Sequence, residues 1–142
     1  MRVAVVGAGH VGLVTAACLA EKGRDVVCVD MDEERVAAIE AGRATIYEPG
    51  LDELVRRNAG TRLRATTDLR EAVLGSELTL LAVPVAIELD EDESLKTLRA
   101  VARAVGEALA GRAEPHAVVV RSTVLPGTTV GVVRTRAPPK PS

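Results

Sequence analysis

Residues 1–30, MRVAVVGAGHVGLVTAACLAEKGRDVVCVD, carry the signal on which the interpretation of the whole chain depends. The apolar run Val3–Val6 predicts a strand, and the glycine-rich stretch after it predicts a tight turn. Helical spacing then predicts a helix that ends at Gly23, with an apolar stripe formed by Val11, Val14, Thr15, Cys18 and Leu19. A second apolar run, Val26–Val29, ends at Asp30. This order of strand, glycine turn, helix, strand and acid is typical of the βαβ unit that binds dinucleotides.

Each glycine of the turn has a separate physical role. Gly7 allows the chain to turn sharply after the strand, Gly9 allows backbone N–H groups to approach a pyrophosphate, and Gly12 allows the helix to pack closely on the strand. The helix begins near His10 or Val11, where unpaired N–H groups and the helix dipole favour an anion. The turn therefore predicts a pyrophosphate site, and a tight strand-to-helix turn without a ligand is the alternative.

An acid at the carboxyl end of the second predicted strand supports the same interpretation. The Asp30 carboxylate can accept hydrogen bonds from both hydroxyls of an adenosine ribose and would repel a 2′-phosphate, which favours NAD over NADP. A solvent-exposed aspartate without a ligand is the alternative. Arg35 lies one helical turn further on. It is close enough to Asp30 to reach the adenine side of a cofactor, or else it is an ordinary surface arginine.

Composition limits the partners that can be expected. The 142 residues carry a net charge of −2 and no basic block, so neither nucleic acid nor an anionic membrane is expected as a partner. No apolar run is long enough to span a bilayer, and the sequence opens directly with a strand rather than a signal peptide. We therefore expect a cytoplasmic protein.

Few side chains are candidates for metal binding or nucleophilic catalysis. With only His10 and His116 as histidines, and with an acidic run at 88–93 that lacks the spacing of a calcium loop, we expect no metal site. The acidic run is interpreted as the solvated start of a helix. Cys18 and Cys28 fall in the first helix and the second strand, where we expect buried thiols rather than a disulfide or a nucleophile.

The rest of the chain repeats the alternation of helix and strand. Helices are predicted over residues 32–41, 51–58, 68–75 and 95–109, and strands over 63–66, 78–83 and 117–120. The prediction is a single α/β domain over residues 1–129, with a Rossmann-type doubly wound parallel sheet of strand order 3-2-1-4-5. A short proline-rich tail follows at 130–142. Because the chain has no Trp or Phe, the core is expected to be aliphatic.

Three further stretches identify a family resemblance. They are Tyr47-Glu48-Pro49-Gly50-Leu51, Arg121-Ser122-Thr123-Val124 and Pro126-Gly127-Thr128-Thr129. Together with the opening GAGHVGLVTAACLA and the segment VCVDMDEERV, they resemble the N-terminal NAD-binding domain of the UDP-glucose/GDP-mannose dehydrogenase family. The resemblance covers the chain to about Thr129.

The resemblance implies a reaction and a set of cofactor contacts. Members of the family oxidise the C6 alcohol of a sugar nucleotide to a carboxylate through two NAD-dependent hydride transfers. The positions that would cradle the NAD pyrophosphate are Gly7, Gly9, His10, Val11 and Gly12, and those that would hold the adenosine ribose are Asp30 and Arg35. Val83 and Pro84 at the end of the fourth strand, and Ser122 and Thr123 after the fifth, would lie on the nicotinamide side. Thr123 would help to place the catalytic water, or would be a helix cap or turn residue.

The chain departs from the family pattern in several ways, one of which is the segment VGVVRTRA after Thr129, with a glycine and several β-branched residues where the family continues with a helix. His10 stands where the glycine turn usually carries a tyrosine. Pro84 is followed by Val85 where the family normally shows a Thr-Pro turn after the fourth strand. The family's nucleophilic cysteine, its lysine and aspartate partners and its sugar-nucleotide domain correspond to positions downstream of this sequence. We therefore expect this chain alone to bind NAD without turnover, and to bind a sugar nucleotide only together with a complementary domain.

Other interpretations stay open from the sequence. One is a truncated or naturally short member of the family, and another is a module that senses NAD or another nucleotide without chemistry. A fragment of another Rossmann oxidoreductase, such as a 3-hydroxyacyl-CoA or 6-phosphogluconate dehydrogenase, is disfavoured by the YEPGL and STVLPGTT stretches. The apolar run Ala117–Val120 is expected to form an edge strand, which predicts a homodimer or another partner contact there.

Overall fold

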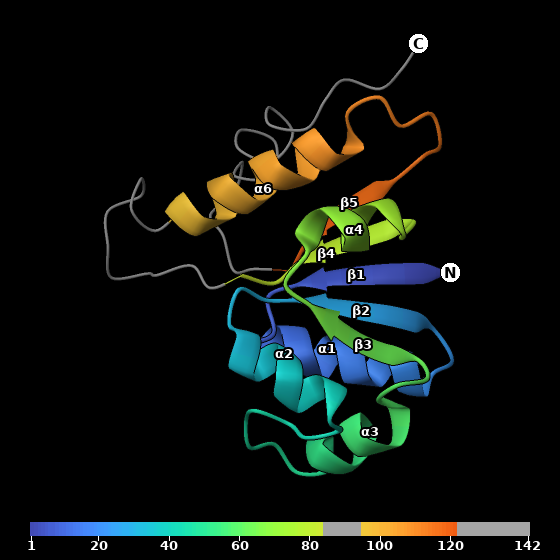
Figure 1. Ribbon diagram of the computed structural model, residues 1–142, viewed down its shortest axis with the longest axis vertical. Helices are drawn as coiled ribbons and strands as arrows, with labels where there is room; N and C mark the ends of the chain where they lie inside the picture. Colours follow the sequence, from blue (N-terminus) through green and yellow to red (C-terminus); the bar gives the residue numbers. More distant parts are fainter. Residues whose placement is uncertain (84–94, 122–142) are drawn as a thin grey trace.

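The computed structural model describes residues 1–83 and 95–121, and its centre is a five-stranded parallel sheet (Figure 1). The strands are β1 (Arg2–Val6), β2 (Asp25–Val29), β3 (Leu63–Thr66), β4 (Leu78–Leu81) and β5 (Ala117–Val120). Their spatial order is β3-β2-β1-β4-β5, and each neighbouring pair is parallel. The predicted doubly wound α/β topology is therefore confirmed.

Helices cover both faces of this sheet (Figure 1). The helices α1 (His10–Glu21), α2 (Glu33–Glu40) and α3 (Leu51–Asn58) lie at one face, and α4 (Leu69–Leu74) and α6 (Lys96–Leu109) lie at the other. The core is built from aliphatic side chains, as the absence of Trp and Phe predicts. β1 shows the alternation that two covered faces require, because Val3 and Val5 pack toward α1 while Ala4 and Val6 pack toward α4 and α6.

The predicted burial of Cys18 is wrong, and the predicted apolar stripe of α1 packs against the core only in part, at Val14 and Leu19. α1 turns Gly12, Leu13, Ala16, Ala17 and Ala20 toward the sheet, whereas Val11 is 42% exposed and Cys18 is exposed. The physical reason is Gly12, which must face β1 because a side chain there would collide with the backbone at Gly7. That requirement fixes the rotation of the helix, and small alanines then allow its close approach to the sheet. Cys28, in contrast, is buried as expected.

β4 is shorter than predicted, because its ladder ends at Leu81 rather than at residue 83. The neighbouring strand β1 ends at Val6, and the Gly7 turn then carries the chain away from β4. Val83 is nevertheless buried. The predictions that concern the acidic run at 88–93, the residues from Ser122 onward and the tail at 130–142 lie outside the described residues.

α1 and α3 are joined at their carboxyl ends by the Glu21 carboxylate. The Arg57 guanidinium lies 2.7 Å from Glu21, and the Asn58 side-chain amide donates a hydrogen bond to the same carboxylate at 2.8 Å. These contacts hold α3, and with it the loop at residues 43–50 that leads into α3, against α1.

Candidate dinucleotide site at the carboxyl edge of the sheet

The Gly7 turn is enclosed by backbone on two sides. Its N–H donates a 2.8 Å hydrogen bond to the carbonyl oxygen of Val29 at the end of β2. Gly7 has a φ of +104°, and a Cβ placed there would lie 2.7 Å from the carbonyl oxygen of Ala82 after β4. Only glycine satisfies both the left-handed backbone and this close approach. The turn therefore lies where β1, β2 and β4 end side by side.

Gly9 differs from Gly7 and Gly12 in what surrounds it. A Cβ at Gly12 would overlap the carbonyl oxygen of Gly7, so Gly12 is required for packing. A Cβ at Gly9 would meet no atom of the described chain within 4 Å. The missing side chain at Gly9 therefore opens space in front of the turn rather than relieving an internal contact. Such open space is what the backbone of a pyrophosphate-binding loop needs.

The amino end of α1 is free to bind an anion. Asp32 caps α2 by accepting hydrogen bonds from the Glu34 and Arg35 N–H groups, and Asp68 caps α4 by accepting one from Glu71. α1 has neither a side-chain cap nor an acidic residue in its first turn. Since the first N–H groups of a helix have no partner within it, α1 presents donors and a partial positive charge. The residues at this end, His10 and Val11, are those that the sequence predicts to cradle a pyrophosphate.

Asp30 links the end of β2 to the glycine turn. One of its carboxylate oxygens accepts a 2.9 Å hydrogen bond from the Ala8 N–H, and the other accepts one of 2.9 Å from the Asp32 N–H. The Asp30 side chain is only 13% exposed. The carboxylate is therefore held at a fixed position beside the turn, where acceptor oxygens can face a ribose.

Arg35, in the first turn of α2, contacts this acid. Its guanidinium lies 3.5 Å from the Asp30 carboxylate and 3.7 Å from that of Asp32. The structure thus brings Arg35 to Asp30, as the prediction of a cofactor contact requires, with nearly half of its side chain exposed.

Val83 lies near the turn, because the N atom of Val83 would be 3.1 Å from a Cβ on Gly7. Pro84, Ser122 and Thr123 lie outside the described residues, so their predicted contacts stay predictions. The structure therefore brings Gly7, Gly9, His10, Val11, Gly12, Asp30, Arg35 and Val83 to one edge of the sheet. That edge is formed by the carboxyl ends of the strands, where doubly wound folds bind ligands.

Sequence reasoning missed one neighbour of this edge. The Glu48 carboxylate lies 3.5 Å from the His10 imidazole, so the loop at residues 43–50 reaches the amino end of α1. The available signal was the YEPGL stretch itself. This stretch carries the family resemblance, but no role was predicted for its glutamate.

The cysteines are poor nucleophiles for this site. Burial raises the pKa of the Cys28 thiol to about 12, and the nearby negative charge of Asp30 adds to that effect. Cys28 is therefore a neutral thiol at physiological pH. Cys18 lies on the exposed face of α1, and neither cysteine forms a disulfide. Within residues 1–83 and 95–121, no group of three or more His, Cys, Asp or Glu side chains could hold a metal ion, and no helix is long and apolar enough to cross a membrane.

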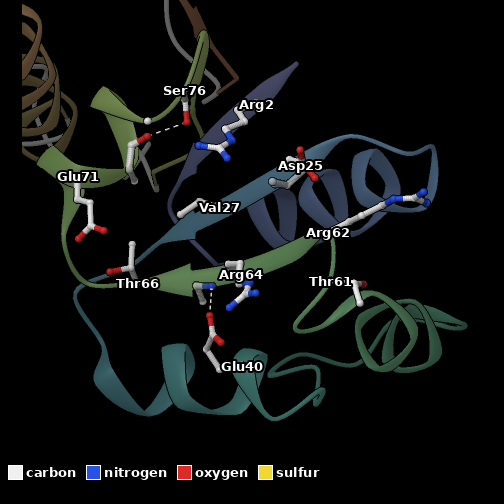
Figure 2. Close-up of a pocket in the computed structure, with 14 residues that line it drawn as sticks. Arg2, Asp25, Val27, Glu40, Thr61, Arg62, Arg64, Thr66, Glu71 and Ser76 are labelled. Carbon is white, nitrogen blue, oxygen red and sulfur yellow. Dashed lines mark hydrogen bonds between the residues drawn. The ribbon is translucent and has the colours of Figure 1, made fainter.

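A hollow of about 560 Å³ lies elsewhere on the domain (Figure 2). Arg2 and Asp25, at the amino ends of β1 and β2, border it together with Arg64 of β3 and Glu71 of α4. Charges of both signs surround the hollow, and none of its lining residues belongs to the predicted cofactor contacts. It therefore does not extend the site at the carboxyl edge.

Relatives of known function match this chain over nearly its full length. UDP-glucose 6-dehydrogenase AglM of Haloferax volcanii is 48% identical over 136 residues, which cover 96% of this chain and 31% of that protein. GDP-mannose 6-dehydrogenase of Azotobacter vinelandii is 46% identical over 134 residues, which cover 94% of this chain and 31% of the relative. The chain therefore spans about a third of the length of these relatives.

A solved structure shows the same fold. In a ternary complex of GDP-mannose dehydrogenase from Pseudomonas aeruginosa, the matching region has a TM-score of 0.91 and 39% sequence identity, and it covers 96% of this chain and 31% of that chain. The parallel sheet, the glycine turn and the acid after β2 define the chain as a dinucleotide-binding domain of the Rossmann type. The NAD-binding domain model of the UDP-glucose/GDP-mannose dehydrogenase family matches residues 1–140. The chain belongs to this family, and NAD is the cofactor of the domain.

Proposed function

We propose that this chain is the NAD-binding part of a nucleotide-sugar 6-dehydrogenase, in which NAD⁺ accepts hydride from a CH–OH group of UDP-glucose or GDP-mannose type. The observation that carries the proposal is Asp30, whose carboxylate is held against the Ala8 N–H at the turn where α1 begins. One short segment thereby offers donors for a pyrophosphate and acceptors for a ribose. The names and activities of the relatives support the class of substrate.

The proposed contacts follow the geometry of this edge. The N–H groups at the start of α1 bind the pyrophosphate, and Gly9 leaves the space that this approach needs. Asp30 accepts hydrogen bonds from the adenosine ribose, and Arg35 holds the Asp30 carboxylate and reaches toward the adenine. Val83, Pro84 and Ser122 are proposed to lie beside the nicotinamide, and Thr123 to place the catalytic water. When bound, NAD⁺ supplies the hydride acceptor.

The chain alone is proposed to bind NAD without turnover. This is supported by Cys28, a neutral thiol inside the sheet, and by Cys18, which lies on the outer face of α1. Cys28 is the penultimate residue of β2 but is completely buried, so its thiol is closed to a ligand at the carboxyl edge. A sugar nucleotide would bind only when a complementary domain is present. A cytoplasmic location is also proposed, supported by the two free thiols.

Calorimetric titration of NAD, NADH and NADP into the purified chain tests this function. We expect the chain to prefer NAD over NADP, and Asp30→Ala to remove that preference because the 2′-phosphate is no longer repelled. Asp25→Ala is the matched control, since Asp25 is exposed at the opposite end of the same strand. Loss of the preference in Asp25→Ala as well, or no dinucleotide binding by the wild type, would contradict the proposal.

A spectrophotometric assay of NADH formation with UDP-glucose and GDP-mannose tests the second part. We expect no NADH from this chain with either sugar nucleotide. Turnover by the chain alone would show that the catalytic groups are present within these 142 residues.

A further inference from the structure

The loop at residues 43–50 has a defined position beside α1. Its link to α3 is fixed because Arg57 and Asn58, at the end of α3, bind Glu21 at the end of α1. The carboxylate of Asp52, in the first turn of α3, accepts a 3.0 Å hydrogen bond from the N–H of Ala44 in the loop. The amino ends of α1 and α3 therefore lie on the same side, and the loop that precedes α3 reaches the glycine turn.

The backbone at Glu48 is held by the start of α3. The carbonyl oxygen of Glu48 accepts a 3.0 Å hydrogen bond from the Leu51 N–H, and Gly50 has a φ of +82°, which allows the sharp entry into the helix. With its backbone fixed in this way, Glu48 places its carboxylate 3.5 Å from the imidazole of His10. Both side chains are about half exposed, so the pair faces the solvent in front of the turn.

Within residues 1–83 and 95–121, the charged groups around His10 come from three elements. α1 itself has no acidic residue in its first turn and contributes its positive amino end. The loop at 43–50 contributes Glu48, and the end of β2 contributes Asp30, which is already paired with Arg35. Among the described carboxylates, Glu48 is the one within ion-pair distance of the imidazole, at the place where a pyrophosphate would approach.

We propose that Glu48 and His10 form a charge pair at the entrance of the pyrophosphate site, and that this pair makes the affinity for NAD depend on pH. The proposal rests on the function proposed above, because it needs NAD to bind at the amino end of α1. Glu48 acts in it as a positioning residue for His10, and neither residue takes part in hydride transfer.

The expected direction follows from the charges. A histidine side chain changes charge between about pH 5 and 8. When His10 is neutral, the Glu48 carboxylate is uncompensated and repels the negative pyrophosphate. When His10 is protonated, it neutralises Glu48 and also attracts the pyrophosphate. The affinity for NAD should therefore be higher when His10 is protonated than when it is neutral, by about two- to fivefold, the size expected for one partly exposed charge contact.

Titrations of NAD at about pH 8 and about pH 5.5 test the proposal, since these values bracket the histidine range. The wild type should bind NAD more tightly at the lower pH. His10→Gln should show equal affinity at both values, because its side chain carries no charge. Glu48→Gln should bind NAD more tightly than the wild type at the higher pH, by about two- to fivefold, because the repelling charge is gone.

Two variants serve as matched controls. His116→Gln removes the other histidine, which precedes β5 at the amino end of the sheet, and should keep the pH dependence of the wild type. Glu53→Gln makes the same charge change on α3 and should leave the affinity at high pH unchanged. A pH dependence that survives in His10→Gln, or a Glu48→Gln affinity equal to that of the wild type at high pH, would overturn the proposal.

A measurement without NAD separates this proposal from the function on which it rests. In the nuclear magnetic resonance spectrum of the free chain, the imidazole signals of His10 should move in Glu48→Gln and stay in place in Glu53→Gln. Unmoved His10 signals overturn the charge pair, whatever the affinity for NAD. If the signals move but the chain binds no NAD at any pH, the charge pair stands. Only the cofactor site and the pH dependence are then overturned.

Discussion

At the scale of single residues, Gly9 and Gly12 are both glycines, but the structure needs each of them for a different reason. Gly12 avoids a collision with the carbonyl oxygen of Gly7 inside the fold, whereas Gly9 borders open space. One glycine therefore serves folding and the other serves the ligand. The two roles can be separated by experiment, because substitution by alanine adds a single methyl group at each position.

We expect Gly9→Ala and Gly12→Ala to have contrasting effects. Gly9→Ala should leave the free energy of unfolding within about 0.5 kcal/mol of the wild type, because the new methyl group meets nothing within 4 Å. It should weaken NAD binding by about tenfold, equivalent to about 1.4 kcal/mol, because the methyl group occupies the space in front of the turn. Gly12→Ala should lower the free energy of unfolding by about 1–3 kcal/mol through overpacking.

Urea denaturation and calorimetry of NAD binding measure these two quantities. If Gly9→Ala bound NAD as well as the wild type, the open space at Gly9 would have no part in cofactor binding.

At this scale, sequence predicted the residues whose role is set by the backbone. Gly7 and Asp30 were predictable because a sharp turn after one strand and an acid after the next have recognisable spacing. The exposure of Cys18 was not predictable, because it depends on the rotation of α1, which Gly12 sets through contact with another segment. The approach of Glu48 to His10 was not predictable either, since it depends on how α3 packs on α1.

At the scale of elements, His116 ties the entry of β5 to β4 and to the end of α4. One of its ring nitrogens lies 3.1 Å from the carbonyl oxygen of Ser76, and the other lies 2.7 Å from the hydroxyl of the buried Thr79. A carbonyl oxygen only accepts, so the nitrogen beside Ser76 carries a proton. When the imidazole is neutral, the Thr79 hydroxyl can donate to the other nitrogen.

We expect His116 to make the stability of the domain depend on pH. Burial lowers the pKa of His116, the positive charge of Arg112 lowers it further, and the hydrogen bond to Ser76 partly opposes both effects. The unfolded chain therefore takes up a proton at a higher pH than the folded chain. The contribution of His116 to stability is complete above its unfolded pKa of about 6.5 and decreases as the pH falls below that value.

Urea denaturation at several pH values checks this expectation. The wild type should lose more stability than His116→Gln between about pH 7.5 and pH 5.5, the range in which an unfolded histidine gains its proton. Equal losses in the two proteins would mean that the neutral imidazole has no role in holding β5.

At the scale of the whole molecule, the two edges of the sheet differ. At the β3 edge, the Glu40 carboxylate of α2 accepts a 2.6 Å hydrogen bond from the Ala65 N–H, which satisfies an edge donor that another chain could otherwise pair with (Figure 2). At the β5 edge, Val119 is 43% exposed. Natural sheets cover or charge their edges to prevent pairing, and among the described residues no strand pairs with the outer side of β5.

We expect the purified chain to self-associate through β5 at high concentration. Val119→Lys should reduce the association, because a charge on an edge strand opposes pairing. Glu40→Gln, which keeps an acceptor for the Ala65 N–H, should leave it unchanged. Static light scattering over a concentration series measures the effect, and a wild type that stays monomeric throughout would contradict the expectation.

The topology of the whole sheet was predictable because alternating helices and strands with right-handed crossovers permit few arrangements. The end of β4 at Leu81 was not, because it depends on where the neighbouring strand β1 turns away. The hollow beside Arg64 was not predictable either, since it forms where three strands and two helices meet.

The loop at residues 43–50 also gives the protein an optical property. Tyr47 is the only residue of the Phe, Tyr and Trp types among the 142 residues, and it is 90% exposed next to Glu48. All intrinsic ultraviolet fluorescence of the chain therefore arises beside the proposed cofactor entrance. With no tryptophan to obscure it, this emission would report directly on the loop, and on transfer of excitation energy to a bound reduced nicotinamide, without any label.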